Sequence, residues 1–402
     1  AILIQVCLGA IYAWSVFTKP LVESGWTKAQ TQIVFSAGLA TFAITMIIAG
    51  RMMPKLGPRK LAMAGGIILA IGYKLAGISS GTGFIKLLIF IGFIGGAGIG
   101  LAYVVPIAVG MRWFPDKKGL ITGLAVAGFG FGATIWVKIA GSWGNLIENY
   151  GLNTTFTIYG VIFFVITFLG GITMVFPPKG WKPKGWEPDE AENNKKNCNA
   201  IEIPSKKMII TPQYYMILAT FICGAGAGLM SIGLMKLFPI MALTQNGVDP
   251  LNASIIAGTA MAVFLATSNG IGRIVWGAIC EKLGVKLSIS IMMIMQGITV
   301  FLFPFLAGTK ILLYIGSTLI GFNFGGNFAL FPMITAHTFG VKSVGQNYGW
   351  IFLAYGIGGI FGPIMGGKLG DIGNFPMAFT ICGILCFFAA IIISTVKPIK
   401  IK

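Results

Sequence analysis

Arg273 is the side chain in this sequence whose type and position most strongly indicate chemistry. It lies inside an apolar segment that runs from about Leu251 to Ile279, with Asn269 one helical turn earlier on the same face. A guanidinium remains charged in proteins, and holding one at bilayer depth costs about 3 kcal/mol or more. Because no aspartate or glutamate lies inside a long apolar segment, its partner is either a polar or aromatic cage or a carboxylate from outside the chain. We interpret Arg273 as a substrate anchor; the simpler alternative is an arginine that snorkels to the headgroups.

Polar and aromatic side chains in the middle of apolar segments are few, and together they indicate one cavity. A single arginine with hydroxyl and amide donors suits one carboxylate, and phenylalanines suit a small apolar tail. We therefore predict a site for a monocarboxylate, although each phenylalanine taken alone is more typical of core packing. The expected site residues are Arg273, Asn269, Tyr12, Tyr103, Tyr355, Asn323, Asn327, Phe324, Phe328 and Phe352.

A dicarboxylate would need a second cation in the same cavity. The one candidate is Lys138, which lies near the outer end of its segment, where a lysine usually snorkels. Protons would need a carrier as well, because the apolar segments contain no carboxylate for the usual proton relay. The sequence therefore leaves two forms of coupling open, a co-transported proton or an exchanged anion.

Enzymatic chemistry finds no support in the sequence. The one histidine, His337, has no nucleophile or carboxylate motif around it, and we interpret it as structural or interfacial. The glycine-rich runs lie inside apolar segments and none matches a P-loop, which argues against ATP-driven transport. The six cysteines show no pairable pattern, so we expect no structural disulfide, no metal and no cofactor; they are Cys7, Cys198, Cys223, Cys280, Cys382 and Cys386.

Membrane-spanning helices must position these residues. Of the 402 residues only 10% are charged, against about 25% in soluble domains, and the mean hydropathy is +0.86. Apolar runs long enough to cross a bilayer occur twelve times, which predicts an all-α integral membrane protein. They begin near Ala1, Thr31, Leu61, Phe84, Leu120, Thr155, Tyr214, Leu251, Leu287, Ile311, Gln346 and Pro376.

The net charge of +18 is concentrated in the loops of one predicted face and in the C-terminal tail. This asymmetry is the positive-inside pattern, which places both termini in the cytoplasm and gives the basic excess a role in orientation. We therefore expect contact with the lipid bilayer and no nucleic-acid partner. The basic clusters lie within 51–60, 112–118, 179–207, 282–286 and 397–402.

One polar stretch, 177–207, separates the apolar segments into two sets of six. Its prolines, glycines and mixed charges cannot build a core, which is typical of a linker on the cytoplasmic side. We predict a six-helix bundle over 1–177, a linker over 178–211 and a second six-helix bundle over 212–402, in a protein that acts as a monomer.

The two sets of six segments share sequence motifs. The pattern G-x-x-x-x-K-L-G occurs from Gly50 to Gly57 and again from Gly277 to Gly284, 227 residues later. Glycine-rich runs at 95–107 and 321–333, and at 127–132 and 354–359, repeat at nearly the same offset. Such a duplication predicts two pseudo-symmetric bundles that rock about a site at their interface near mid-membrane.

The first of these motifs extends to Arg59 and Lys60 and resembles the cytoplasmic signature of the major facilitator superfamily. Pro54 occupies the position where that family usually has aspartate, so the charge contact that latches the first half is in question. Glu281 keeps an acid in the second copy of the motif.

Further motifs along nearly the whole chain resemble the oxalate/formate antiporter family of that superfamily. RWFPDKKG, which contains Arg112 and Asp116, together with NYGW is a fairly specific pairing. The other motifs are GAIYAWSVF, TPQYY, NGIGR and FALFP, at 9–17, 211–215, 269–273 and 328–332.

The resemblance implies roles for individual residues. In the family's oxalate exchanger an arginine and a lysine hold the substrate between aromatic residues; the arginine corresponds to Arg273, whereas the lysine position is Tyr355 here. The tyrosines correspond to Tyr12 and Tyr103, and three further aromatic positions are Phe324, Phe328 and Phe352. Loss of one cation argues against the oxalate dianion.

These observations together favour a secondary transporter of a small monocarboxylate such as lactate, pyruvate or formate, located in the plasma membrane. An oxalate:formate antiporter is the alternative within the same class of protein. A membrane receptor that does not transport is a third possibility, and the intramembrane arginine and the internal repeat argue against it.

Overall fold

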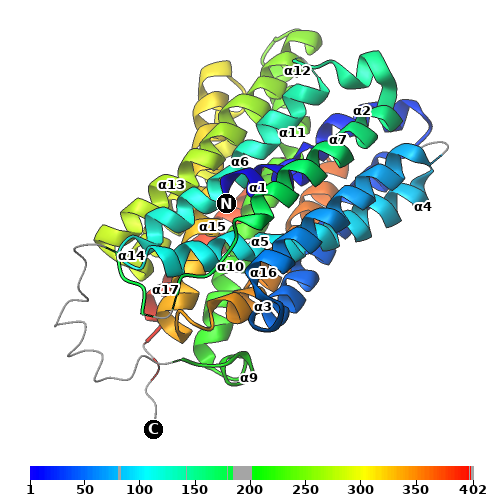
Figure 1. Ribbon diagram of the computed structural model, residues 1–402. Helices are drawn as coiled ribbons and strands as arrows, with labels where there is room; N and C mark the ends of the chain where they lie inside the picture. The colour runs from blue at the N-terminus through cyan, green and yellow to red at the C-terminus, as the bar shows by residue number, and fades with distance from the viewer. Residues whose placement is uncertain (80–82, 142, 179, 184–201, 398, 400–402) are drawn as a thin grey trace.

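The computed structural model describes residues 1–79, 83–141, 143–178, 180–183, 202–397 and 399. Within this part of the chain every regular element is a helix, and the long helices run side by side along one direction (Figure 1). Ten of the described helical stretches are long and apolar enough to cross a membrane. The expected all-α membrane architecture is therefore confirmed.

The first set of helices, which we name the N-terminal half, contains nine elements. They are α1 (Ile2–Leu8), the 3-10 helix η1 (Gly9–Trp14), α2 (Ser15–Glu23), α3 (Lys28–Ile78), α4 (Phe84–Leu87), the π-helix η2 (Leu88–Gly95), α5 (Gly96–Trp113), α6 (Lys118–Ala140) and α7 (Leu146–Ile172).

The second set follows the segment that joins the two halves, and we name it the C-terminal half. Its elements are α9 (Ser205–Met208), α10 (Pro212–Leu234), α11 (Leu237–Gln245), α12 (Pro250–Thr259), the π-helix η3 (Ala260–Leu265), α13 (Ala266–Leu283), α14 (Val285–Leu306), α15 (Lys310–Phe339), α16 (Val344–Asp371) and α17 (Phe375–Thr395).

The element α3 is two membrane-spanning helices joined at a kink. Gly57 adopts φ 77° and ψ 162° inside it, a left-handed conformation that glycine tolerates and other residues avoid. When the two parts of α3 are counted separately, and the short apolar stretch from α1 to α2 is added to the ten long spans, the described helices provide twelve candidate membrane crossings. The prediction of twelve helices is confirmed.

Local sequence signals explain where several helices begin. Thr27 and Gln30 form a reciprocal capping box at the start of α3, which satisfies two backbone N–H groups that the helix leaves free. Asp249 accepts the N–H groups of Leu251 and Asn252 at the start of α12, where Pro250 occupies the first helical position. These caps fix the ends of helices whose interiors are held by apolar packing.

The two copies of the glycine motif make equivalent contacts between the halves. A Cβ at Gly50 of α3 would collide with the carbonyl of Gly345 in α16. A Cβ at Gly277 of α13 would collide with the carbonyl of Gly119 in α6. The pairs α3 with α16 and α6 with α13 therefore meet backbone to backbone, and Figure 1 shows the helices of each pair side by side. Both motifs end in a glycine with positive φ, Gly57 at 77° and Gly284 at 79°.

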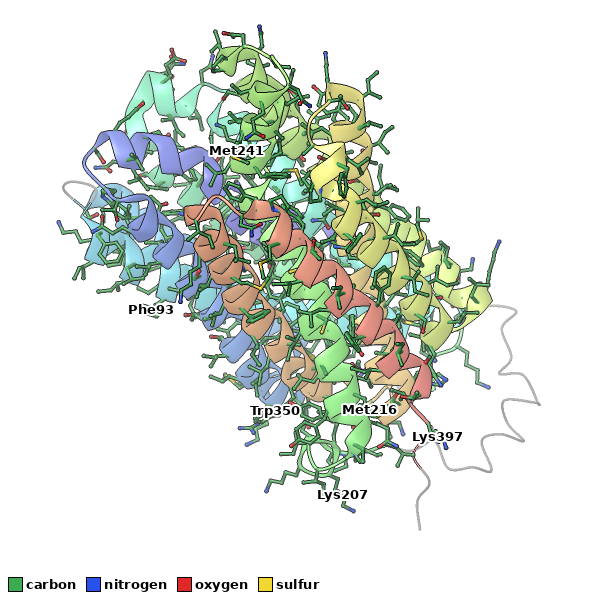
Figure 2. All side chains as sticks on the ribbon, turned by 180° about the vertical axis from the view of Figure 1, so that it is seen from behind. Phe93, Lys207, Met216, Met241, Trp350 and Lys397 are labelled. Atoms are coloured by element: carbon green, nitrogen blue, oxygen red, sulfur yellow. The ribbon has the colours of Figure 1, made fainter. Side chains whose placement is uncertain are left out.

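The surface of the bundle is consistent with a lipid environment. Large apolar side chains such as Leu169, Phe305 and Ile311 are exposed around its flank. Figure 2 shows Lys207 and Lys397 at one end and Met241 toward the other. We name the end with Lys207 and Lys397, where the glycine motifs also lie, the motif end. The middle of the expected linker, 184–201, lies outside the described residues. This stretch includes Cys198 and part of the basic cluster expected over 179–207.

Candidate functional site

Arg273 lies fully buried where α13 meets α6 of the N-terminal half. Its exposed fraction is 0%, so the side chain points into the bundle and not to the headgroups. The Nε atom donates to Oδ1 of Asn269 over 3.1 Å, and Nη1 donates to the backbone carbonyl of Val126 over 3.0 Å. The third nitrogen, Nη2, is buried with no hydrogen-bond partner among the described residues.

Two aromatic rings flank the guanidinium of Arg273. Its Cζ lies 4.0 Å from the ring centroid of Phe328 and 5.3 Å from that of Phe129. Such contacts contribute roughly 0.5–2 kcal/mol each, which offsets part of the cost of burying the charge. One ring comes from each half, so the cation lies between the halves.

Glycines allow α6 and α13 to approach closely at this level. A Cβ at Gly123 would collide with the carbonyl oxygen of Arg273, and a Cβ at Gly130 would lie 2.8 Å from Cα of Gly270 and 3.3 Å from Nε of Arg273. The glycine-rich sequence of α6 therefore brings a backbone carbonyl of one half within hydrogen-bond distance of a cation of the other.

A pair of tyrosines joins the halves at the same site. Oη of Tyr12 in η1 lies 2.6 Å from Oη of Tyr355 in α16, and either can donate. The ring of Tyr12 also meets Phe129 edge-on at 5.2 Å. The predicted site residues Tyr12, Tyr355 and Arg273 thus lie together, although they are far apart in the sequence.

The remaining predicted aromatic residues line the same space. Phe328 meets Phe324 at 5.3 Å and Tyr355 at 5.4 Å between ring centroids. Phe352 meets Tyr355 at 5.0 Å and Tyr103 at 5.4 Å. The structure therefore brings all three phenylalanines and all three tyrosines of the prediction around Arg273.

Asn327 points elsewhere. A Cβ at Gly224 of α10 would lie 2.7 Å from its Oδ1 and 3.1 Å from the sulfur of Met293 in α14, so this amide faces the interior of the C-terminal half. Its Nδ2 donates to the carbonyl of Phe324 over 3.1 Å. The side chain of Asn323 is also buried, and neither of its polar atoms has a partner in the described part of the chain.

Lys138 and His337 lie at helix ends. Lys138 is half-buried in the last turn of α6, and His337 is exposed in the last turn of α15. The five described cysteines are free thiols. Within the described ranges no group of three or more histidine, cysteine or acidic residues could hold a metal ion.

Sequence reasoning missed four contributors to the site: Phe129, Phe42, Tyr348 and the Val126 carbonyl. Phe42 meets Phe352 at 4.9 Å and Tyr103 at 5.1 Å, and Phe129 meets Tyr103 at 5.3 Å. Phe129 and Tyr348 lie in motifs visible in the sequence, the AGFGFG run and NYGW. A backbone carbonyl has no sequence signature, so no pattern could have found the contact from Val126.

The motif end holds further contacts between the halves. Nη2 of Arg112 donates to the carbonyl of Lys342 over 3.2 Å, and Oε1 of Glu281 accepts the N–H of Leu120 over 2.9 Å. The side chains of Arg59, Lys60 and Asp116 are exposed. Of the predicted motif residues, Gly50, Gly277, Arg112 and Glu281 therefore contact the opposite half, whereas a Cβ at Gly57 or Gly284 would meet nothing within 4 Å.

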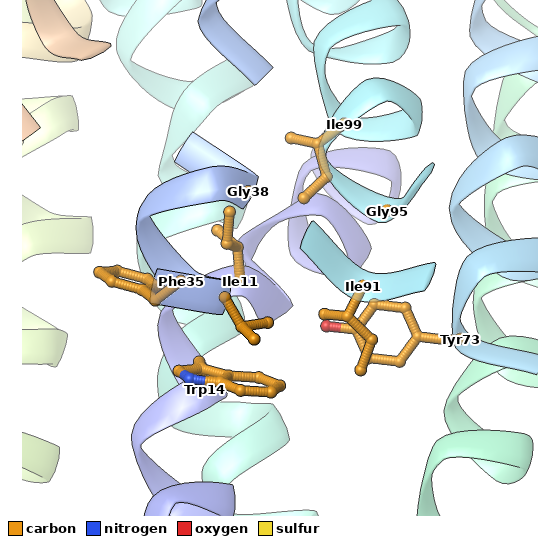
Figure 3. Close-up of a pocket in the computed structure, with 9 residues that line it drawn as sticks. Ile11, Trp14, Phe35, Gly38, Tyr73, Ile91, Gly95 and Ile99 are labelled. Carbon is orange, nitrogen blue, oxygen red and sulfur yellow. The ribbon is translucent and has the colours of Figure 1, made fainter. Parts of the chain in front are cut away.

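A separate apolar pocket lies inside the N-terminal half. Figure 3 shows Ile11 and Trp14 from η1 facing Ile91 of η2 and the ring of Tyr73. The indole N–H of Trp14 is already used, donating to the carbonyl of Thr31 over 2.9 Å. No residue of the Arg273 site lines this pocket, so we do not assign the substrate to it.

Comparisons with known proteins agree with this architecture. The family model described as Major Facilitator Superfamily matches residues 1–268 and 216–400. The fucose transporter FucP in its outward conformation has a similar structure, with a TM-score of 0.64 and 18% identity over 98% of both chains.

Three curated proteins are similar in sequence over most of the chain. An uncharacterized MFS-type transporter, YhjX, from Escherichia coli is 28% identical, over 89% of this chain and 84% of its own. The oxalate:formate antiporter of Oxalobacter formigenes is 26% identical, over 97% and 88%. Apicoplast pyruvate carrier 1 of Toxoplasma gondii is 22% identical, over 83% and 67%. With its twelve helices in two similar halves, the chain belongs to the major facilitator superfamily.

Proposed function

We propose that this transporter carries a small monocarboxylate of the lactate, pyruvate or formate class, bound through its carboxylate to Arg273. The observation behind the proposal is the Nη2 atom of Arg273, which is buried between the halves and has no hydrogen-bond partner among the described residues. A buried charged donor without an acceptor is costly. A carboxylate oxygen is the acceptor that a guanidinium binds best.

The charges around the site favour one carboxylate over two. Arg273 is the one fully buried cation among the described residues, and none of their buried side chains carries a carboxylate. A monocarboxylate would neutralise the site, whereas a dianion would leave one negative charge without a partner at bilayer depth. The phenylalanines beside Arg273 suit a short apolar tail.

Alternating access is the mechanism we propose for transport. The two pseudo-equivalent contacts, Gly50 with Gly345 and Gly277 with Gly119, lie at the motif end and give the halves a surface on which to rock. Arg273 and the Tyr12–Tyr355 pair lie at that interface, so a substrate there would be exposed first to one side and then to the other. We further propose that 178–211 links two bundles spanning 1–177 and 212–402.

The surroundings and partners of the carrier follow from the charge distribution. We propose that both termini and the motif end lie in the cytoplasm, because the basic clusters gather there. We further propose that the protein is located in the plasma membrane and acts as a monomer. The coupled species is a proton or an exchanged anion. Exchange of oxalate for formate is the second candidate, which the similarity to the Oxalobacter formigenes antiporter over 97% of this chain favours.

Thermal unfolding of the purified protein with a panel of acids tests this proposal. The panel comprises formate, acetate, lactate, pyruvate, oxalate and malonate at fixed pH, followed by uptake of the best ligand into proteoliposomes. A ligand at 100 times its dissociation constant should stabilise the protein by about 2.7 kcal/mol. Stabilisation by monocarboxylates together with their uptake supports the proposal. If oxalate stabilises most, the exchanger takes its place, and stabilisation without uptake by any acid would indicate a receptor.

A further inference from the structure

Three buried hydrogen-bond donors near the centre of the site make no hydrogen bond of good geometry in the described part of the chain, although Tyr103 lies close to Arg273. They are Nη2 of Arg273 and the hydroxyls of Tyr103 in α5 and Tyr348 in α16. Arg273, Tyr103 and Tyr348 each have an exposed fraction of 0%. Unpaired buried donors are rare in native proteins, because each costs about 1–3 kcal/mol.

The three donors lie around one place. The charge of Arg273 acts on both Tyr103 and Tyr348. The ring of Phe352 connects the two tyrosines, at 5.6 Å from Tyr348 and 5.4 Å from Tyr103 between centroids. A carboxylate has two oxygens with about four acceptor positions, which is enough for three donors drawn from both halves.

The hydroxyls of Tyr12 in η1 and Tyr355 in α16, by contrast, already have a hydrogen-bond partner. Tyr355 follows Tyr348 by seven residues and therefore lies on the same helix face, about 10 Å along the axis. Its hydroxyl is already bonded to that of Tyr12 at 2.6 Å. In such a pair one hydroxyl donates to the other, so one proton remains available for an additional acceptor.

From these contacts we infer a division of labour inside the site, which rests on the proposed function. Tyr103 and Tyr348 hold the substrate carboxylate together with Nη2 of Arg273. The Tyr12–Tyr355 pair donates its remaining proton to an oxygen on the carbon next to the carboxylate. Tyr348 is thus a substrate-binding residue, and the hydroxyl pair determines specificity for 2-oxo and 2-hydroxy acids over plain alkanoates.

Two substitution classes test this division, because each hydroxyl can be removed without changing the ring. Kd values of the full-length wild type and its variants would be measured for pyruvate, lactate and propionate, where propionate has the same carbon skeleton without the second oxygen. Tyr348→Phe and Tyr103→Phe should raise all three Kd values alike by about tenfold or more, because a hydrogen bond to a charged oxygen is lost. Tyr73→Phe, which removes a buried hydroxyl inside the N-terminal half, is the matched control.

Tyr355→Phe and Tyr12→Phe should act on the acids unequally. They should weaken pyruvate and lactate about 2- to 10-fold, as expected for a neutral hydrogen bond, and leave propionate unchanged. A Tyr348→Phe protein that binds all three acids as tightly as wild type would overturn the assignment of Tyr348. An equal loss for propionate in Tyr355→Phe would overturn the role of the pair. A wild type that binds formate but none of the three acids would overturn the role of the pair, and one that binds neither formate nor the three acids, although it is folded like Tyr73→Phe, would show that the proposed function itself fails.

Discussion

Oε1 of Glu281 in α13 accepts a hydrogen bond from the backbone N–H of Leu120 at the start of α6, over 2.9 Å. The first repeat has Pro54 at the position equivalent to Glu281, so α3 offers no carboxylate to the start of α16. Glu202, from the segment between the halves, occupies that place instead. Its Oε1 accepts the N–H of Lys342 over 2.9 Å, and its Oε2 accepts that of Ser343 over 3.0 Å. The chain thus supplies an acid to both helix starts from unrelated positions.

Removal of either carboxylate should weaken the motif end. Glu281→Ala and Glu202→Ala each remove a helix-capping acceptor, which typically costs about 0.5–2 kcal/mol. We expect a lower midpoint of thermal unfolding and slower uptake for both. Asp116→Ala is the control, because Asp116 is exposed at the same end and surface substitutions usually stay within about 0.5 kcal/mol. Equal effects for all three variants would show that the two caps have no special role.

Sequence periodicity and length predicted the fold well because a bilayer imposes them. A helix must be about 20 apolar residues long to span the hydrocarbon core, so all twelve crossings are visible as apolar runs. The same reasoning could not reveal that Gly9–Trp14 is a 3-10 helix or that Leu88–Gly95 and Ala260–Leu265 are π-helices. Those differences shift backbone hydrogen bonds by one residue and leave the hydropathy pattern unchanged.

The candidate site was predictable as far as single residues stand out chemically. Arg273, Tyr12 and Tyr355 are polar groups in apolar segments, and the structure brings them together. Asn327 is equally polar, yet it faces Gly224 and Met293, because small changes in helix rotation decide which side of a helix faces the cavity. Glu202 lies in a polar segment, and nothing in the sequence around it indicates that this acid contacts the start of α16.

Replacement of Arg273 by lysine should abolish most substrate binding without unfolding the protein. Lysine keeps the charge but loses the planar fork that bonds Asn269 and Val126 while presenting Nη2 to a ligand. We expect the Kd of the preferred acid to rise about tenfold or more, with uptake reduced in parallel. Arg59→Lys serves as the control because Arg59 is exposed. Near-normal uptake by the Arg273→Lys protein would contradict the anchor role.

Replacement of Tyr355 by lysine should create affinity for a dicarboxylate. The new ammonium would lie beside Tyr12 and near Arg273, because Tyr355 contacts the first at 2.6 Å and interacts electrostatically with the second. Two like charges in a buried site repel each other, so the variant should unfold at a lower temperature in buffer alone. Oxalate should then stabilise it more than it stabilises wild type. Tyr355→Phe is the control. If oxalate does not raise the unfolding temperature of the Tyr355→Lys protein more than that of wild type, Tyr355 lies outside the site.

The backbone contact between Gly277 and Gly119 should make a single methyl group costly. Ala at position 277 would press its Cβ against the carbonyl of Gly119, with the carbonyl carbon at 3.0 Å, and overpacking of this kind costs about 1–3 kcal/mol. Because the two glycines belong to different halves, the methyl group should hinder their closure at the motif end. We therefore expect both a lower unfolding temperature and slower uptake in proteoliposomes.

Gly367→Ala is the matched control, which shows whether the effect of Gly277→Ala comes from the contact with Gly119 or from placing alanine in a helix. Gly367 also lies inside a helix, α16, but a Cβ there would meet nothing within 4 Å. Since alanine is favoured over glycine in a helix by about 0.5–1 kcal/mol, Gly367→Ala should be neutral or slightly stabilising, with uptake preserved. If Gly277→Ala and Gly367→Ala behave alike, α6 and α13 do not meet backbone to backbone, and the proposed rocking surface at the motif end loses its support.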